Sequence, residues 1–187
     1  MKRASLTDQV DVNDLRRQVA FDRLLARLFR DEPVPWALKG GYAMELRLKA
    51  SRSTVDIDLA LQRLPTGATD SGNTNRLVRE MLQSAASGPL ADWFEYTIGS
   101  PILDLTAAPY GGARYPVEAR MDARIFARFH LDVGIGDVVM RPLETVACQD
   151  WLGFAGIQWP QVQMIPRGAA VRGKNSCLHA TAERGKQ

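Results

Sequence analysis

Hydrophobic and polar residues recur with two different periods along the chain, and these periods predict where helices and strands lie. Positions 14–29 have hydrophobic residues at intervals of three and four, which is typical of an amphipathic helix. Positions 55–61 alternate instead, so that hydrophobic side chains face one side of an expected strand and Asp56 and Asp58 face the other. The first third of the chain therefore predicts a helix followed by sheet-forming segments.

The segment between these two regions has the most informative order of elements. It reads WALKGGYAMELRLKASRSTVDIDLAL, and it predicts a strand at 36–38, a glycine turn at Gly40-Gly41, a helix at 42–49 and a strand at 55–61. Glycine permits backbone dihedrals and a close approach that a β-carbon would prevent. Two carboxylates on one strand face are therefore expected to lie near a glycine turn.

This combination suits nucleotide chemistry. Asp56 and Asp58 can hold a divalent cation, and the glycine amides can receive phosphate oxygens. With a third carboxylate on a neighbouring strand, the site could bind two metal ions and align a hydroxyl group for attack on a nucleotide α-phosphate. The alternative is an Asp pair that only solubilises a strand edge, beside a glycine turn without a ligand. The turn, helix and strand together favour the site.

The segments KGGYAMELRL and RSTVDIDLAL resemble the AbiEii/AbiGii toxin family of nucleotidyltransferases, in the DNA polymerase β-like superfamily. That superfamily combines a Gly-Gly or Gly-Ser turn, a helix, and a strand of the form hydrophobic-Asp-hydrophobic-Asp. The resemblance covers about residues 15 to 166. It implies nucleotide binding at Lys39, Gly40 and Gly41, and metal binding at Asp56 and Asp58.

A later segment, FARFHLDVG, provides the candidate for the third carboxylate. Asp132 stands between two hydrophobic residues, in the form that the superfamily's third metal-site strand takes. The competing candidate is Asp137, whose position after a glycine favours a loop. His130 shares the face of Asp132, although a single histidine on a strand is more often a half-buried neutral residue. Asp56, Asp58 and Asp132 are therefore the expected catalytic residues and metal ligands.

The resemblance implies an α+β fold with a nucleotidyltransferase-like mixed sheet and helices packed on one side. It also implies metal-dependent transfer of a nucleotidyl group from an NTP to an acceptor, with Mg²⁺ as cofactor and tRNA or another RNA as acceptor. Family members act as toxins in toxin–antitoxin or abortive phage infection systems, so a cognate antitoxin encoded nearby is an expected partner. Two alternatives stay open: an inactive chain that only binds nucleotide or a partner, and a transferase for a small molecule such as an aminoglycoside.

The remaining sequence predicts one further helix and several strands. We expect a loop at 65–74, a helix at 75–84 capped by Thr74, strands at 93–98, 114–120, 126–133 and 162–166, and irregular connections after residue 141. Asp104 and Asp122 have the surroundings of turn residues. Five arginines on the first helix could contact RNA phosphates, but a solvated helix face is the more common explanation.

Composition limits the size of the core, the kinds of partner and the cellular compartment that we expect for the protein. A chain of 187 residues with 45% hydrophobic residues can form one good core. A net charge of +3 and a pI near 9.1 permit an RNA partner without requiring one. Cys148 and Cys177 have no paired spacing, which indicates free thiols in a reducing cytoplasm. Without a long hydrophobic run, we expect no membrane association.

The last twenty-one residues differ in character from the rest. Residues 1–166 form the expected core domain, whereas 167–187 have no hydrophobic periodicity and are expected to be an aberrant, disordered tail. Family members continue with a helix resembling EQQFAEKLHA, whose lysine is expected to contact the nucleotide. Back-translation of the tail with permissible codons, read one nucleotide later from Gly168, gives EQQFAEKTPASTRPRSGAN. We therefore hypothesise a frameshifted tail, in which Lys174 is not the family's catalytic lysine.

Overall fold

The computed structural model describes residues 11–49, 54–106, 108–137 and 139–166. Its helices are α2 (Val12–Leu28), α3 (Gly40–Leu48), α4 (Ser71–Ala86) and the short 3-10 helix η1 (Gly153–Ala155). Its strands are β1 (Trp36–Lys39), β2 (Asp56–Leu61), β3 (Phe94–Ile98), β4 (Leu103–Asp104), β5 (Gly112–Met121), β6 (Arg124–Ile135), β7 (Glu144–Ala147) and β8 (Gln161–Met164). The Cys177 prediction and the tail prediction lie outside the described residues.

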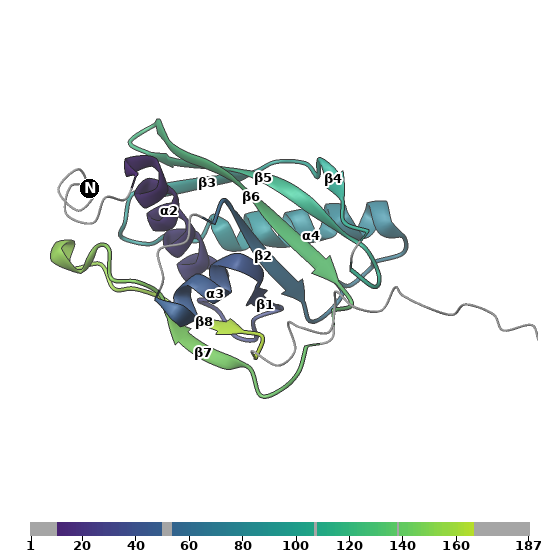
Figure 1. Ribbon diagram of the computed structural model, residues 1–187. Coiled ribbons are helices and arrows are strands. Elements are labelled where there is room, and N and C mark those ends of the chain that lie inside the picture. The colour runs from purple at the N-terminus through teal and green to yellow at the C-terminus, as the bar shows by residue number, and fades with distance from the viewer. Residues whose placement is uncertain (1–10, 50–53, 107, 138, 167–187) are drawn as a thin grey trace, which may run out of the picture.

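The strands form one mixed sheet in the order β3-β5-β6-β2-β1-β8-β7, with β4 paired to β5 (Figure 1). β2 runs parallel to β6, and β1 runs parallel to β8, while the other neighbours are antiparallel. Strands β2 and β6 come from distant parts of the chain, yet they are adjacent at the centre of the sheet. The mixed sheet and the helices confirm the predicted fold class.

One face of the sheet forms the core with the helices. Phe21 of α2 contacts Tyr42 of α3 and Phe129 of β6 edge to face, with ring centroids 5.0 and 4.7 Å apart. Val78 and Leu82 of α4 are buried in the same cluster. Fully burying a residue such as Leu82 contributes about 1.5–3 kcal/mol, so this shared core holds the helices on the sheet. The predicted packing of helices on one side is thus confirmed.

Along each strand, the residues between the core residues point to the face of the sheet opposite the helices. In β2, Ile57, Leu59 and Leu61 are buried, whereas Asp56 and Asp58 are half-buried. In β6, the side chains of Leu131 and Val133 lie in the core cluster, and Asp132 lies between them along the strand. Since side chains alternate across a strand, the acidic residues of both strands face away from the helices.

The start of α4 differs from the prediction. The helix begins at Ser71, and its N-cap is Asp70, whose carboxylate accepts a hydrogen bond of 2.9 Å from the amide of Asn73. Thr74 lies inside the helix, and its hydroxyl donates to the carbonyl of Asp70. Thr74 is therefore not the cap. Asp is at least as good a cap as Thr, so the first available cap residue starts the helix earlier.

Two short strands are also missing from the prediction. Asp104 lies in β4, not in a turn, and β7 lies in the region expected to be irregular. Both strands are two to four residues long, and β7 alternates only weakly in burial. Their pairing with β5 and β8 defines them, and such pairing leaves little trace in local sequence. Asp122 does lie in the turn between β5 and β6, as predicted.

The arginines of α2 are not all solvated. Arg23 and Arg27 are only 6% and 3% exposed, and both bind Asp92, which is 1% exposed. Arg27 donates two hydrogen bonds to the two carboxylate oxygens of Asp92, at 2.8 and 2.6 Å, and Arg23 donates one at 2.6 Å. Neither RNA contact nor a solvated face describes these two residues. They fasten α2 to the segment that leads into β3.

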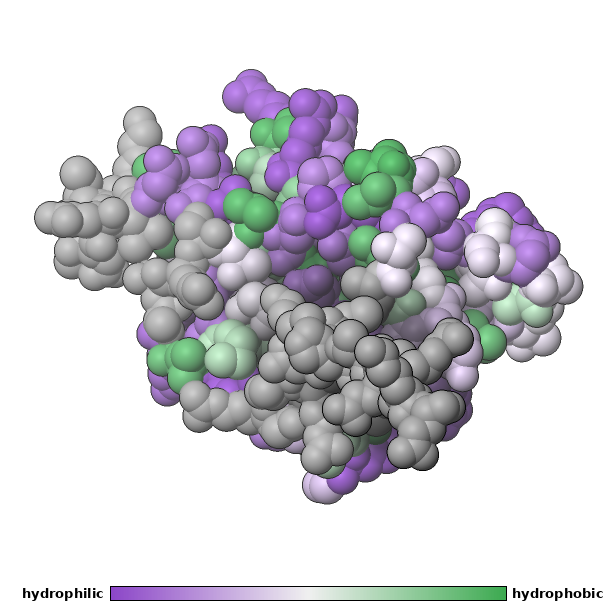
Figure 2. All heavy atoms as spheres, turned by 45° about the vertical axis from the view of Figure 1, so that its right-hand side comes forward, coloured by the Kyte–Doolittle hydropathy of each residue, from purple (hydrophilic) through white to green (hydrophobic). Residues whose placement is uncertain are grey.

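The described surface is mixed in polarity. Figure 2 shows one face of the molecule, on which hydrophobic residues form separate small patches among hydrophilic ones. In the part of the chain that the structure describes, none of the helices is both long enough and apolar enough to span a bilayer. Cys148 is a buried free thiol, as its lack of a paired cysteine predicts.

Candidate active site

Four charged residues form a row across the outer face of the sheet. In the strand register, Lys39 of β1 pairs with Asp58 of β2, Asp58 pairs with Asp132 of β6, and Asp132 pairs with Arg114 of β5. Residues that are directly opposite each other on adjacent strands point to the same face of a sheet. The row therefore reads positive, negative, negative, positive, with two carboxylates at its centre.

The first residue of α3 places its backbone directly against Asp58. Gly40 has φ of +70°, and a β-carbon built there would lie 2.0 Å from Oδ2 of Asp58. Only glycine leaves this space open, and glycine adopts this positive dihedral without the strain of a β-carbon. The amide of Gly41 donates a hydrogen bond to Asp58. The predicted glycine turn and the predicted carboxylate are thus in contact, and the glycines form the N-terminal turn of α3.

A guanidinium group lies between the other two carboxylates. Arg114 donates from Nε to Oδ1 of Asp132 at 2.7 Å and from Nη2 to Oδ2 at 2.8 Å. The same Nη2 lies 3.1 Å from Oδ2 of Asp56. The Asp132 pair is bidentate, which is the strongest geometry for an arginine and a carboxylate. His130 completes the cluster, with Nδ1 3.1 Å from Oδ1 of Asp56.

A bulge in the β5–β6 hairpin brings Arg114 to this position. Near the turn, Met121 pairs with Arg124, and the register shifts between Ala119 and Arg120. An unshifted hairpin would place Ala113 opposite Asp132 and turn Arg114 to the core face. Because one inserted residue reverses the facing of every residue beyond it, the bulge decides which side chain meets Asp132.

Lys39 contacts a different carboxylate at the end of β6. Its Nζ donates to Oδ2 of Asp137 in a half-buried ion pair. Both atoms crowd Gly134, where an added β-carbon would lie 2.6 Å from Asp137 and 2.8 Å from Lys39. Asp137 follows the end of β6, as its expected loop position requires, yet it belongs to the same site.

The charged groups of the cluster shift the pKa of Asp58 in opposing directions. Burial raises the pKa of its carboxyl group, the neighbouring Asp132 raises it further, and Lys39 and the Gly41 amide lower it. For Arg114, the hydrogen bonds to Asp132 raise the pKa above its ordinary value, so it stays charged. Four aspartates at 56, 58, 132 and 137 oppose two cations, which leaves a formal charge of two negatives.

Most residues of this cluster were candidates on sequence alone. The structure brings Lys39, Gly40, Asp58 and Asp132 together in one place, with Asp56 two residues before Asp58 on the same strand face. Gly41 contributes its amide. Sequence reasoning missed Arg114 and the ion pair of Asp137. The strand pattern at 114–120 gave the element correctly, but the role of Arg114 depends on the bulge.

Comparison with known proteins identifies the group of relatives. The profile of the family described as nucleotidyl transferase AbiEii toxin, type IV toxin–antitoxin system, matches residues 23–186. The chain belongs to this family. The matched range includes part of 167–187, outside the described residues, so the frameshift hypothesis stays a prediction. No match was found among curated protein sequences.

One solved structure supports the fold of this AbiEii family member, and a second is reported beside it for its coverage alone. The nucleotidyltransferase toxin MenT4 from Mycobacterium tuberculosis H37Rv is 18% identical, with a TM-score of 0.57 over 84% of this chain and 50% of MenT4. JHP933 from Helicobacter pylori is 12% identical, with a TM-score of 0.48 over 86% of this chain and 55% of JHP933. The chain thus spans about half the length of each of these structures. At this identity, the MenT4 match supports the fold alone.

The AbiEii relationship implies a divalent cation, and the residues can be tested for one. In the described ranges, no three carboxylate, imidazole or thiol groups are arranged to hold a metal ion. The guanidinium of Arg114 lies between two of the candidate carboxylates, Asp56 and Asp132. The chemistry of the donors nevertheless fits, because hard divalent cations prefer carboxylate oxygens. A single divalent cation would also neutralise the formal charge of the cluster.

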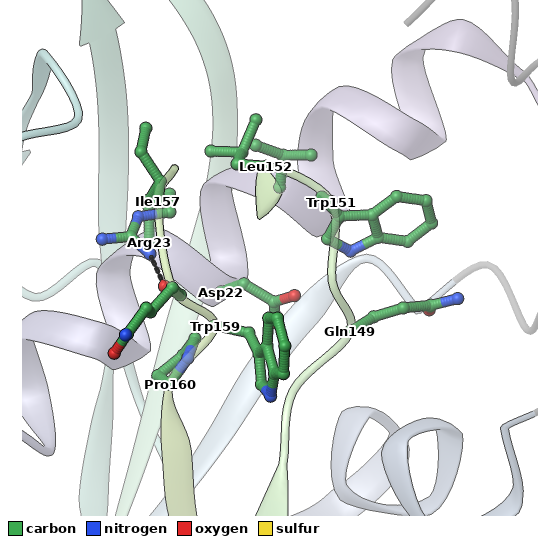
Figure 3. Close-up of a pocket in the computed structure, with 10 residues that line it drawn as sticks. Asp22, Arg23, Gln149, Trp151, Leu152, Ile157, Trp159 and Pro160 are labelled. Atoms are coloured by element: carbon green, nitrogen blue, oxygen red, sulfur yellow. Dashed lines mark hydrogen bonds between the residues drawn. The ribbon is translucent and has the colours of Figure 1, made fainter. Parts of the chain in front are cut away.

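A separate cavity lies against α2, away from the carboxylates. It is lined by Asp22 and Arg23 and by the segment that carries Trp151 and Trp159 (Figure 3). Its volume of about 10 Å³ suffices for about one water molecule. We assign no function to the two tryptophans. Arg23 lines the cavity and donates to the carbonyl of Gln158 at 2.9 Å.

Proposed function

We propose that this AbiEii family chain is a metal-dependent nucleotidyltransferase that transfers a nucleotidyl group from an NTP to an acceptor hydroxyl group. One observation carries the proposal: Asp58 and Asp132 are opposite each other on parallel strands, directly beside the Gly40 backbone. Two carboxylates and a helix N-terminus thereby meet at one point. Such an arrangement can hold a cation and receive a phosphate group at the same time.

Each residue has a distinct proposed role. Asp56 and Asp58 would hold Mg²⁺, which when bound screens the phosphate charge and polarises the α-phosphate. The N-terminal turn of α3 at Gly40 and Gly41 presents backbone amides and the positive end of the helix dipole to the triphosphate. Lys39, at the end of β1, supplies a further positive charge, which now neutralises Asp137.

Asp132 is assigned to the acceptor and is also a candidate third ligand of the metal. It would orient the acceptor hydroxyl group and take its proton as the oxygen attacks the α-phosphorus. One phosphorus–oxygen bond forms to the acceptor, and the bond between the α-phosphorus and the bridging oxygen of the β-phosphate breaks. Pyrophosphate leaves with the bonding electrons, so the reaction balances without a further reactant.

The acceptor is proposed to be RNA, with tRNA as the first candidate. The net charge of +3 is compatible with an RNA partner, and membership in a type IV toxin–antitoxin family supports a toxin role with an antitoxin as partner. MenT4, with a similar fold, is itself a nucleotidyltransferase toxin.

The test is labelling of bulk tRNA with each of the four α-labelled NTPs, with and without Mg²⁺. Transfer should require Mg²⁺ and should be lost in Asp58→Asn. Asp122→Asn is the matched control, because Asp122 lies in the β5–β6 turn with φ of +50°, which asparagine tolerates. Equal labelling by Asp58→Asn and the control would overturn the assignment of the site.

A second outcome has its own meaning. Specific nucleotide binding without any transfer to RNA, protein or aminoglycosides would show a binding module in place of an enzyme. The Arg114 contacts favour keeping this candidate, since they occupy two of the proposed ligands. Equilibrium dialysis with NTP alone separates this candidate from a misfolded preparation.

A further inference from the structure

Three arginines on the outer face of the sheet make ion pairs, but their environments differ. Arg120 and Arg128 both bind Glu118, at 2.7 Å each. This group lies on β5 and β6, two register positions from His130 and further from the carboxylates. These arginines are 41% and 66% exposed. Such pairs on a solvated sheet face contribute little free energy and need no functional explanation.

Arg114 is different because both of its partners are proposed metal ligands. Its side chain is 29% exposed, while those of Asp132 and Asp56 are 12% and 21% exposed. Three donor–acceptor contacts of 2.7, 2.8 and 3.1 Å fix one guanidinium group between two carboxylates. The position that a cation would share between Asp56 and Asp132 is therefore held by a cation of the protein itself.

We propose that Arg114 is a positioning residue that competes with the divalent cation for Asp56 and Asp132. This inference rests on the proposed function and adds a property that the function alone does not contain. The guanidinium stabilises the carboxylate cluster when no metal is bound. Its single contact with Asp56 occupies one carboxylate oxygen that a cation would otherwise use. Arg114 thereby raises the metal concentration at which the site fills.

The two contacts of Arg114 differ in strength, so a cation should displace the guanidinium from Asp56 before it displaces it from Asp132. The Asp56 contact is single and 3.1 Å long, whereas the Asp132 pair is bidentate and shorter. If Asp56 and Asp58 held a cation, the weaker contact of Arg114 would be lost first, and Asp132 would stay paired with Arg114. Ligation by Asp132 as well requires the stronger pair to break. Removal of the guanidinium should therefore strengthen metal binding.

The test measures binding of Mn²⁺ alone to the full chain, by electron paramagnetic resonance and isothermal titration calorimetry, without nucleotide. Arg114→Gln should bind Mn²⁺ about tenfold more tightly than wild type, because a charge-assisted contact worth about 1.4 kcal/mol no longer competes. Arg114→Lys should be intermediate, since an ammonium group cannot make the bidentate pair. Arg120→Gln removes the same charge from the same strand face and should leave Mn²⁺ affinity unchanged.

The outcomes separate the two proposals. A gain of affinity in Arg114→Gln cannot arise from partial unfolding, so it supports the competition directly. Mn²⁺ affinity equal to wild type in Arg114→Gln, together with loss of binding in Asp58→Asn, overturns the role of Arg114 and leaves the proposed function intact. Mn²⁺ binding that persists in Asp58→Asn overturns the metal site itself, and the proposed function with it.

Discussion

Replacing Gly40 by alanine offers the sharpest test of how the backbone and Asp58 fit together. The added β-carbon would lie 2.0 Å from Oδ2 and 2.5 Å from the carboxylate carbon of Asp58. Ordinary contact begins at 3.4 Å, so the carboxylate must move by about 1.4 Å or the start of α3 must shift. The φ of +70° adds a strain of about 1–2 kcal/mol for any residue with a β-carbon.

A second glycine separates these two effects. Gly156 has φ of +74°, almost the same as Gly40, and no heavy atom lies within 4 Å of the place that a β-carbon would take there. Gly156→Ala should therefore show the backbone strain alone, as a loss of about 1–2 kcal/mol in the free energy of unfolding. Both variants are measured by urea denaturation, and both are assayed for Mn²⁺ affinity and nucleotidyl transfer.

Only Gly40→Ala should lose function. A misplacement of about 1 Å in a catalytic group costs about a hundredfold in rate, so transfer should fall by at least that factor while Gly156→Ala stays near wild type. Mn²⁺ affinity should fall in parallel, because Asp58 is a proposed ligand. If Gly40→Ala retains the metal affinity and activity of Gly156→Ala, the contact between Gly40 and Asp58 has no functional weight.

Three further predictions concern groups outside this contact. Asp92→Ala leaves the guanidinium groups of Arg23 and Arg27 buried without their carboxylate, and denaturation should show a loss of about 3–5 kcal/mol; a loss below about 1 kcal/mol would contradict this. Burial raises the pKa of Asp22 to about 7 from an ordinary 3.8, so its contribution to stability is fully present below pH 3.8 and is lost as pH rises through 7. Asp22→Asn should abolish this decline in the free energy of unfolding. If the slope of stability against pH is unchanged in Asp22→Asn, the assignment to Asp22 is refuted. Lys39→Met should raise the KM for NTP about tenfold. It should change the free energy of unfolding by less than about 1 kcal/mol, since the ion pair of Lys39 is half-buried. An unchanged KM would remove Lys39 from the nucleotide site.

Local pattern was sufficient to predict the central part of the fold. The glycine turn and the alternation around Asp56 and Asp58 are short-range features, so β1, α3 and β2 could be read from adjacent residues. Asp132 was found because it stands between hydrophobic residues on an expected strand, in the form that the superfamily's third metal-site strand takes. These predictions needed no knowledge of which strands pair.

The role of Arg114 could not be predicted, because it depends on strand register. A single shift near Ala119 determines whether Arg114 or Ala113 lies opposite Asp132, and a bulge of this kind has no distinctive sequence here. The buried cluster around Asp92 was missed for a related reason. Helix periodicity placed Arg23 and Arg27 among the polar positions of α2, whereas their contacts come from a residue 69 and 65 positions away.

The β5–β6 hairpin also has a consequence for the order of folding. Arg114 and Asp132 are 18 residues apart, whereas His130 and Asp56 in the same cluster are 74 apart. A hairpin forms in about 1–10 μs from local contacts, and pairing across a long loop is slower. We therefore expect Asp132 to acquire its counter-ion before β2 pairs with β6 and brings two more negative charges. In that order the hairpin would already be neutralised at the strand where like charges would otherwise repel.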